Sequence, residues 1–335
     1  MKKTIILSSA ACLVLAAASC DREANPSERI ENSEKAEITV NLSGEGYTLD
    51  LPSGTKASLD ENGEKAVNTV QIFIFREDGT LDAYTSESAS SGIKLSCTTG
   101  KRTIHALVNA PALGGVNNED DLKAAVTSLA DNALGSFVMT GSIIETISAE
   151  ASYDIEVKRI VSRISVGTIT AAFTSEAYRN MTFTLKRIFM LNVAGNTTYG
   201  TEKEPDAWFN KMAWESSACD ALLGSANINR TLADKTPYQP DEVFYVYPNP
   251  TMSDPDASSF PRCTRLVLET QLGDKTYYYS IKIPGIGRNK KYSVNSVTIT
   301  RPGSLNPGED INSSELTFSV VVEPWEEGSS QEITI

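Results

Sequence analysis

The chain has 335 residues, of which 40% are hydrophobic and 22% are charged, and its formal net charge is −13. This length allows two domains, each with its own core. The acidic balance argues against a nucleic-acid partner, because nucleic-acid phosphates are bound by basic surfaces.

The first 19 residues have the features of an export signal. Lys2 and Lys3 precede an uncharged apolar run, and the small residues Ala17-Ala18-Ser19 lead directly into Cys20. The apolar run is too short for a stable membrane-spanning helix. A cysteine directly after the predicted cut indicates a bacterial lipoprotein whose Cys20 thiol carries diacylglycerol, although Ala17 stands where the usual lipobox has leucine. The alternative is an ordinary secretory signal in which Cys20 has no special role.

A charged tether, two strand-like stretches and a polar loop follow the signal. Residues 21–36 are charged and lack apolar periodicity, which is typical of a flexible tether. Alternating apolar residues predict strands within 37–51, and residues 52–58 form a polar loop that exposes Lys56. The alternating apolar side chains are Ile38, Val40, Leu42, Tyr47, Leu49 and Leu51.

β-Branched and aromatic residues predict a series of strands from Val67 onward. Residues 67–75 and 81–84 are expected to form a hairpin, because the Asp78-Gly79 pair between them suits positive φ. Residues 93–97 and 102–108 resemble a second hairpin that turns at Thr98-Thr99-Gly100. Further strands are predicted over 155–169, 182–193, 242–247, 265–271, 277–283 and 291–300.

Residues 118–130 have the clearest helical pattern. Leu122, Ala125, Val126 and Leu129 share one helix face, and the acidic first turn suits a helix N-terminus. Many short strands and one clear helix predict an all-β protein with two tandem β-sandwich domains. The predicted boundaries are 1–19 for the signal peptide, 20–56 for the lipidated tether and N-terminal strand, 57–154 for the first sandwich and 155–335 for the second.

No residue pattern indicates catalysis. The single histidine, His105, lies in a strand-like alternation, so we expect a structural role and find no Ser-His-Asp or Cys-His arrangement around it. Glu119, Asp120 and Asp121 could be imagined as a cation site, but their position at a helix start explains them. We therefore expect no enzymatic activity and no metal or other cofactor.

Two loop and strand features have both a functional and a structural interpretation. Asp254 and Asp256 stand in a polar loop that could hold calcium, yet acidic loops are ordinary in an acidic protein. The run Tyr277-Tyr278-Tyr279 could stack on sugars. A strand that places Tyr277 and Tyr279 on one face and Tyr278 on the other explains the run by core packing, which we favour.

The cysteines after Cys20 also leave two interpretations. Cys97, Cys219 and Cys263 are an odd number without CxxC spacing. A disulfide between Cys219 and Cys263 is compatible with an exported protein, and buried free thiols are at least as compatible.

The two ends of the chain have matching strand patterns. Near the N-terminus, the predicted strands at 37–51 precede the basic loop, where a trypsin-like protease could cut between Lys56 and Ala57. At the C-terminus, residues 315–323 alternate apolar with mostly polar residues, and Ile333 and Ile335 resume the pattern after Pro324-Trp325. The C-terminal strand could therefore fill the groove that a displaced N-terminal strand would leave in a neighbouring copy. The same pattern also describes two ordinary strands and an ordinary loop. The donor side chains would be Leu316, Phe318, Val320 and Val322, and the displaced ones Ile38, Val40, Leu42, Leu49 and Leu51.

Several segments give the chain a resemblance to the fimbrillin family, the subunits of type V pili of Bacteroidales. The resembling segments are the signal ending at Cys20, the loop at Thr55-Lys56-Ala57, VNTVQIFIFREDGTLDAY at 67–84, IHALVNAP at 104–111, VKRIVSRISV at 157–166, YVYPNP at 245–250, KYSVNSVTITRPG at 291–303 and FSVVVEPWEEG at 318–328. The resemblance implies two transthyretin-like β-sandwich domains, export as a lipoprotein, proteolytic removal of the N-terminal strand and assembly by donor-strand exchange. Family members are usually cut after arginine, whereas the candidate here is Lys56.

We therefore expect a structural subunit of a cell-surface fimbria that serves adhesion. Its partners would be other copies or related pilins, a trypsin-like maturation protease, the outer membrane through lipid on Cys20, and a host or bacterial surface ligand. The alternative is a non-polymerising surface lipoprotein, either a pilus anchor or accessory subunit or a binder of glycan or host protein.

Overall fold

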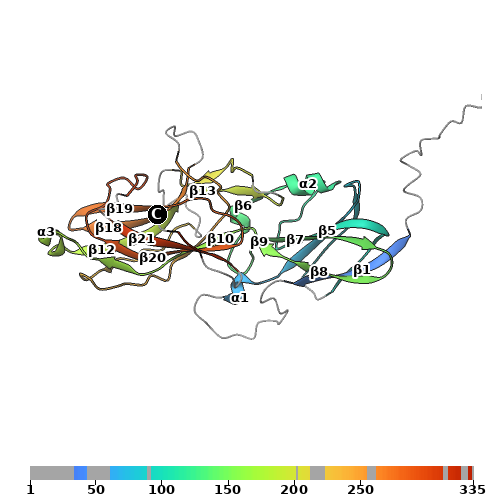
Figure 1. Cartoon of the computed structure of the whole chain (residues 1–335), viewed down its shortest axis with the longest axis horizontal. Helices are drawn as coiled ribbons and strands as arrows, with labels where there is room; N and C mark the ends of the chain where they lie inside the picture. Colours follow the sequence, from blue (N-terminus) through green and yellow to red (C-terminus); the bar gives the residue numbers. More distant parts are fainter. Residues whose placement is uncertain are drawn as a thin grey trace, which may run out of the picture. The chain divides into compact units, whose positions relative to one another are not determined.

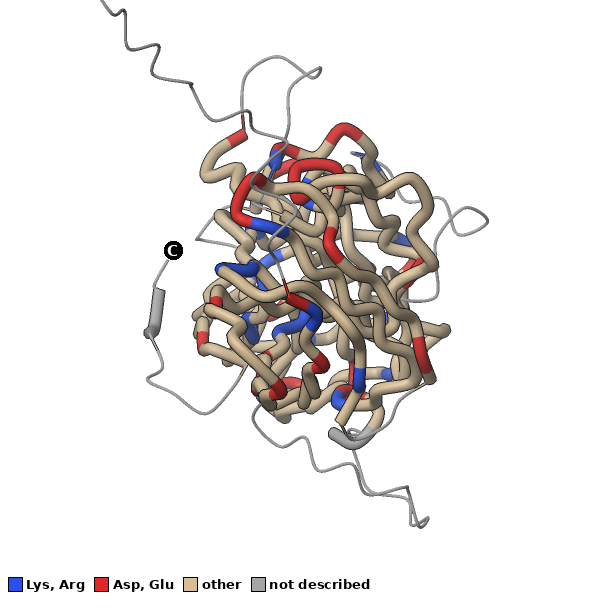
Figure 2. The backbone as a smooth tube through the Cα atoms, turned by 90° about the vertical axis from the view of Figure 1, so that its right-hand side faces the viewer, with Lys and Arg blue, Asp and Glu red and all other residues tan. Residues whose placement is uncertain are grey.

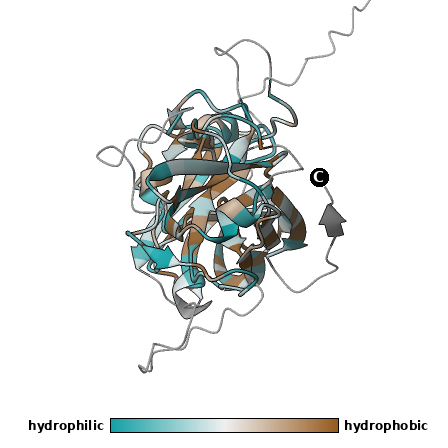
Figure 3. Ribbon diagram, turned by 90° about the vertical axis from the view of Figure 1, so that its left-hand side faces the viewer, coloured by the Kyte–Doolittle hydropathy of each residue, from teal (hydrophilic) through white to brown (hydrophobic). Residues whose placement is uncertain are grey.

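The computed structural model describes residues 34–43, 61–88, 92–200, 203–211, 223–254, 262–311, 316–325 and 331–333. Strands dominate these residues, so the predicted all-β class is confirmed, and residues 35–335 hold together as one compact unit (Figure 1). Along many strands the hydropathy alternates from residue to residue, which matches the period of two expected for strands with one buried face (Figure 3). Acidic and basic positions are both spread widely over the chain (Figure 2).

The first group of strands forms two sheets. A three-stranded sheet has the order β4-β1-β8, and a five-stranded sheet has the order β3-β2-β5-β7-β9. The strands are β1 (Lys35–Ser43), β2 (Thr69–Arg76), β3 (Leu81–Ser88), β4 (Ile93–Thr98), β5 (Gly100–Val108), β7 (Met139–Ile147), β8 (Ala151–Glu156) and β9 (Lys158–Arg159).

The second group forms two larger sheets and contributes to two small ones. One large sheet has the order β17-β10-β20-β21-β22, with β11 also paired to β20, and the other has the order β16-β12-β18-β19. The strands are β10 (Ser162–Val166), β11 (Ile169–Ala171), β12 (Phe183–Leu191), β16 (Arg230–Thr231), β17 (Val243–Val246), β18 (Thr264–Leu272), β19 (Lys275–Ile283), β20 (Lys290–Ile299), β21 (Leu316–Pro324) and β22 (Gln331–Ile333).

Short elements complete the described fold. The pairs are β13 (Val193–Ala194) with β15 (Trp208–Phe209), and β6 (Val126–Ser128) with β14 (Asn196–Thr198). The helices are α1 (Glu61–Glu64), α2 (Glu119–Ala124), α3 (Glu176–Arg179) and a 3₁₀ turn at Leu129–Asp131. Among the described residues, none of the helices combines the length and apolarity needed to cross a bilayer.

Strand β2 separates two hydrophobic cores. Its Val70, Ile72 and Ile74 side chains face the core beneath β1, whereas Phe73 and Phe75 belong to a larger core that continues into the second group of strands. All five are at most 2% exposed. The sheet is therefore covered on both faces at β2, which explains why this strand is a nearly continuous apolar run rather than an alternating one.

The first predicted hairpin is confirmed, and the second is wrong. Strands β2 and β3 pair antiparallel around a turn in which Gly79 has φ +82°. Strands β4 and β5, however, lie in different sheets, because β4 pairs with β1 while β5 pairs with β2 and β7. The short link through Thr98 and Gly100 passes from one sheet to the other, so the alternation predicts each strand but not its partner.

The predicted helix at 118–130 ends early. The described helix α2 stops at Ala124, and Ala125 leaves it with ψ 139°. Residues 126–128 then pair with β14, and Val126, expected on the buried face, is 55% exposed. Val126 and Thr127 are β-branched and favour strand, so tertiary pairing with β14 outweighs the helical spacing of the apolar residues.

The junction between the two groups is built around Glu64, which is 6% exposed. Its carboxylate accepts hydrogen bonds from the Tyr245 hydroxyl at 2.8 Å and the Trp325 indole N–H at 3.3 Å. The Arg163 guanidinium lies 3.5 Å away, and Arg159 donates to the Glu64 carbonyl at 2.7 Å. Burial and the Glu64 carboxylate raise the pKa of Tyr245, so its hydroxyl stays protonated and donates.

The predicted boundary between domains at 154/155 falls inside β8, and the first group of strands continues to Arg159. The pairing of β6 with β14 and the contacts of Glu64 also join the two groups. The division into two domains at this boundary stays a prediction.

Asp82 fixes the end of β4 to its neighbours. Its side chain is 1% exposed and accepts hydrogen bonds from the Thr98 amide at 2.8 Å and from Arg102 at 3.0 Å. It also forms an ion pair with Arg76, whose guanidinium nitrogen lies 2.5 Å from a carboxylate oxygen of Asp82. Burial alone would raise the pKa of Asp82, but the hydrogen bonds from Thr98 and Arg102 and the charge of Arg76 outweigh it and hold that pKa below its usual value. The cluster ties β4 to β2, β3 and β5 without using β1.

We expect Tyr245→Phe to lower the free energy of unfolding by about 1.5–3 kcal/mol, because it removes a hydrogen bond to a buried carboxylate. Chemical denaturation measures this change. Glu77→Gln is the control, since Glu77 and its partner Lys101 are exposed and such pairs contribute about 0–1 kcal/mol. Equal stability of Tyr245→Phe and the native chain would contradict the role assigned to Glu64.

We expect the Asp82 cluster to lose its contribution to stability in acid. Because the pKa of Asp82 is lowered in the folded chain, the contribution is complete above the ordinary value of 3.8 and is lost as the pH falls through the lower folded-state pKa. Denaturation midpoints measured at neutral pH and below about pH 4 should therefore differ less for Asp82→Asn than for the native chain. An identical pH dependence of the two would exclude this contribution.

Candidate assembly site

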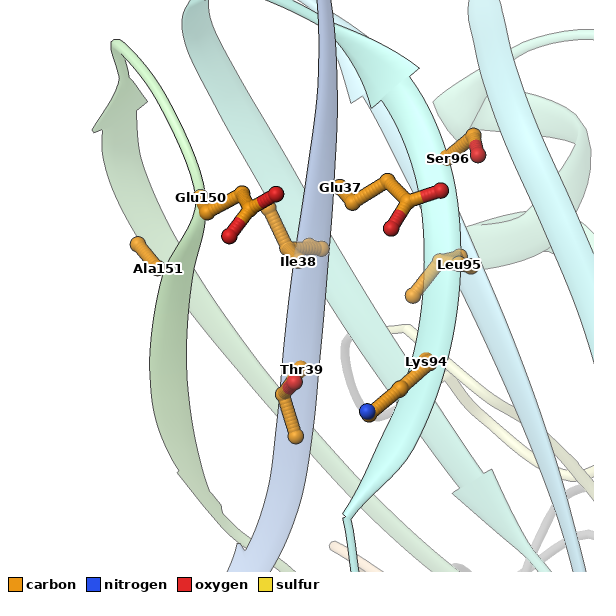
Figure 4. Close-up of a pocket in the computed structure, with 8 residues that line it drawn as sticks. All are labelled: Glu37, Ile38, Thr39, Lys94, Leu95, Ser96, Glu150 and Ala151. Atoms are coloured by element: carbon orange, nitrogen blue, oxygen red, sulfur yellow. The ribbon is translucent and has the colours of Figure 1, made fainter.

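Strand β1 is the central strand of its sheet, although it is the first described strand of the chain. It pairs antiparallel with β4, from Lys35 opposite Thr98 to Val40 opposite Ile93. On its other side it pairs parallel with β8, from Ile38 opposite Ala151 to Ser43 opposite Glu156. Figure 4 shows β1 between these two strands. Removal of β1 would therefore leave two facing strand edges with unpaired backbone groups.

The inner face of β1 closes the smaller hydrophobic core. Ala36, Ile38 and Val40 are 5%, 1% and 0% exposed, and the partly buried Leu42 packs against the same core. Full burial of a valine, leucine or isoleucine side chain contributes ~1.5–3 kcal/mol. The space that β1 occupies is thus an apolar groove, with β4 and β8 as its walls and the five-stranded sheet as its floor.

The outer face of β1 is polar. Asn41 donates to the Ser152 hydroxyl at 3.0 Å and to the Asp154 carboxylate at 2.9 Å. A shallow surface hollow of about 700 Å³ lies over the strand, where Glu37, Lys94 and Glu150 project (Figure 4). Any strand that replaced β1 would need the same pattern, apolar inward and polar outward.

The predicted displaced and cleaved residues are only partly described. Ile38, Val40 and Leu42 lie on the inner face of β1, where the alternation placed them. Leu49 and Leu51, together with Lys56, Ala57 and Cys20, lie outside the described residues. Residues 44–60 connect β1 to α1, so a cut after Lys56 would separate β1 from the chain that begins at α1.

The predicted donor residues belong to their own sheet in this structure. Strand β21 pairs antiparallel with β20 from Leu316 opposite Ile299 to Pro324 opposite Lys290. Leu316 and Val320 are 1% and 2% exposed, while Phe318 and Val322 are partly buried against the same core. The strand is fixed at its end by Trp325, which is 6% exposed and bound to Glu64.

Strand β22 is held by fewer contacts than β21. It pairs with β21 through three residue pairs, from Val320 opposite Ile333 to Val322 opposite Gln331, and ends the strand order of its sheet. The last part of the chain is therefore the part of the C-terminal segment that could leave its own sheet at the smallest cost in strand pairing.

Sequence reasoning missed three parts of this site. Ala36 extends the inner face of β1 by one position, and its period-two spacing from Ile38 was a usable signal. Cys97 lies opposite Ala36 on the neighbouring strand β4, and Glu64 joins the chain after the predicted cut to Trp325. No local pattern marks these last two, because each acts through a partner distant in sequence.

The acidic triplet and the histidine have structural roles. Asn118 and Asp121 form a capping box at the start of α2, as a helix-start interpretation predicts. Glu119 pairs with Lys123 at 2.7 Å and with His105 at 2.9 Å. Burial lowers the pKa of His105 despite its hydrogen bond to Glu119. Within the described ranges, no cluster of three His, Cys, Asp or Glu residues could hold a metal ion.

The acidic loop, the tyrosine run and the described cysteines also have structural roles. Asp254 binds Arg265 and lies 3.4 Å from Lys282, whereas Asp256 lies outside the described residues. Tyr279 is fully buried in the larger core and Tyr278 packs on the opposite face of β19, so the core interpretation of the tyrosine run is confirmed. Cys97 and Cys263 are buried free thiols, and Cys219 is not among the described residues.

Several solved bacterial proteins have a similar fold. The chain is similar to a protein assigned to cell adhesion from Bacteroides eggerthii DSM 20697, at 17% identity and a TM-score of 0.64, over 87% of this chain and 96% of that chain. A second such protein, from Parabacteroides distasonis ATCC 8503, matches at 18% identity and a TM-score of 0.63, over 88% and 99%. A fimbrilin (fimA) from Porphyromonas gingivalis W83 matches at 16% identity and a TM-score of 0.58, over 87% and 98%. These likenesses show the fold.

A family model matches part of the sequence. No curated protein matches the chain. Residues 36–187, however, match the family model for the major fimbrial subunit protein (FimA). This range includes β1 from Ala36 onward, both walls of its groove and the floor beneath it. This part of the chain is therefore similar to major fimbrial subunit proteins.

Proposed function

We propose that this chain is a fimbrial stalk subunit that polymerises by donor-strand exchange after loss of β1. In this scheme the chain is exported as a lipoprotein on Cys20, held at the outer membrane and cut between Lys56 and Ala57 by a trypsin-like protease. The C-terminal strand of the next copy, or of a related pilin, then fills the groove. The observation that carries the proposal is the central position of β1, whose loss opens an apolar groove between two intact strands.

The energetics favour refilling of an emptied groove. Each branched apolar side chain that the incoming strand buries in the groove contributes ~1.5–3 kcal/mol, before the cost of ordering that strand. Backbone hydrogen bonds to β4 and β8 would add to this gain. A filled joint between copies would therefore dissociate slowly.

The chain around the groove has anchors that do not depend on β1. The Asp82 cluster fixes β4, and Glu64 fixes the segment directly after the proposed cut to Tyr245, Arg159 and Trp325. These contacts support a cut subunit that remains folded while its groove is open.

The contacts of the C-terminal segment favour a donor shorter than first expected. Exchange of β21, with Leu316, Phe318, Val320 and Val322, would break a long ladder with β20 and expose two buried side chains. Exchange of β22 and the residues after it would break three residue pairs. We therefore place the exchanged strand at Gln331–Ile335 and keep β21 in its own subunit.

The alternative function is a non-polymerising surface lipoprotein, such as an anchor that retains β1 or a binder of a host or bacterial surface ligand. N-terminal sequencing of protein from intact cells separates the two. A chain that begins at Ala57 supports the stalk subunit, and one that begins at Cys20 supports the alternative.

We expect Cys97 to report the state of the groove. Burial, together with the charge of Asp82, raises the pKa of this thiol to about 11, and Ala36 of β1 lies opposite it. In a Cys219→Ser background, maleimide should label Cys97 slowly in the precursor and at least tenfold faster after trypsin removes β1. The fully buried Cys263 serves as the internal control. Unchanged labelling after a verified cut and separation of the fragment would contradict the proposal.

We expect deletion of residues 326–335 to abolish polymerisation while the subunit stays folded, because β21 and Trp325 remain in place. Cleaved protein should then give no SDS-resistant ladder on unheated gels. The matched control is a double substitution, Ile333→Val with Ile335→Val, which keeps the alternation and should keep the ladder. Ladders of normal length from the deleted chain would rule out this donor.

A further inference from the structure

The four inner positions of the groove differ in size and in access to water. At one end, Ala36 is 5% exposed and lies opposite Cys97, so this position accepts a small side chain. The positions of Ile38 and Val40 are 1% and 0% exposed and accept branched side chains. At the other end, Leu42 is partly exposed and lies opposite Ile155. The groove thus has a narrow closed end and a wider open end.

The proposed donor segment is also asymmetric. In the sequence Gln331-Glu332-Ile333-Thr334-Ile335, the residues that share one strand face are Gln331, Ile333 and Ile335. A polar side chain therefore leads two branched apolar ones. Two orders are possible in the groove, with the segment running in the same direction as β1 or in the opposite direction.

A donor segment that runs in the same direction as β1 fits the groove poorly in every register. With Ile333 and Ile335 at the positions of Ile38 and Val40, Gln331 replaces Ala36 beside Cys97 and buries an amide in a space made for a methyl group. A shift by two residues toward Leu42 buries Gln331 at the position of Ile38. The opposite shift forces Ile333 into the position of Ala36, a space that a methyl group fills.

A donor segment that runs opposite to β1 gives Gln331, Ile333 and Ile335 positions that suit their size and polarity. Ile333 then takes the position of Val40, Ile335 takes that of Ile38, and Gln331 lies at the position of Leu42, where its amide can reach water. Glu332 comes to the outer face near Asp154, but water screens that repulsion at the surface. The buried positions therefore decide the direction.

We propose that the tail of a second copy enters the groove antiparallel to the β1 it replaces, in the register that pairs Gln331 with the position of Leu42. The new strand runs parallel to β4 and antiparallel to β8, the reverse of β1. This inference rests on the proposed function, and it adds the direction and register that make the joint specific.

Disulfide trapping in cleaved, polymerised protein tests the direction. Ile335→Cys with Ala151→Cys, in a Cys97→Ser and Cys219→Ser background, should form a bond between copies after oxidation, because the position of Ile38 lies opposite Ala151. Gln331→Cys, with native Cys97 and Cys219→Ser, should form none. A disulfide between residue 331 and Cys97 without one between residues 335 and 151 overturns the direction. SDS-resistant ladders that contain neither disulfide overturn the register. Absence of ladders from the same protein without introduced cysteines would instead defeat the proposed function.

A matched pair of donor variants tests the register without changing the groove. Gln331→Leu should raise the temperature at which SDS-resistant ladders dissociate, because leucine reproduces the side chain of Leu42. Gln331→Ala should not raise it. The reverse order, with alanine stabilising and leucine weakening the joint, would place residue 331 at the position of Ala36 and overturn the proposal.

Discussion

The burial of β1 between β4 and β8 is the constraint on which the first half of the fold depends. Its inner side chains close a core whose floor is the five-stranded sheet, and its backbone completes two ladders at once. A strand in this position stabilises the fold more than an edge strand would, because its loss leaves two edges and one apolar surface exposed. The same geometry makes the space it fills specific for another strand with the same two faces.

Long-range side-chain contacts hold the rest of the molecule independently of β1. Glu64 joins the start of the body to β17 and to Trp325 at the end of β21, while Asp82 holds the corner between β4 and β5. Trp325 lies between the well-paired β21 and the short β22, so the hydrogen bond to Glu64 separates a fixed part of the C-terminal segment from a weakly paired one. These contacts give the fold a stable frame around its first and last strands.

Much of the fold could be predicted from the sequence, because strand alternation depends on local residue order. The strand positions, the hairpin around Gly79 and the two faces of β1 follow from period-two spacing and turn residues. Strand partners could not be predicted in this way. The alternation in β4 is compatible with pairing to β5 as well as to β1, so it does not identify the partner. The apolar spacing at 118–130 predicts a helix, but residues 126–128 pair with β14 instead.

For the candidate site, the sequence by itself determined which side chains of β1 and β21 face inward. The tertiary structure decided that β1 is central, that β21 belongs to its own sheet, and that Cys97, Glu64 and Trp325 take part. The physical reason is that alternation specifies which face of a strand is apolar, whereas its neighbours are chosen by contacts between residues far apart in the chain.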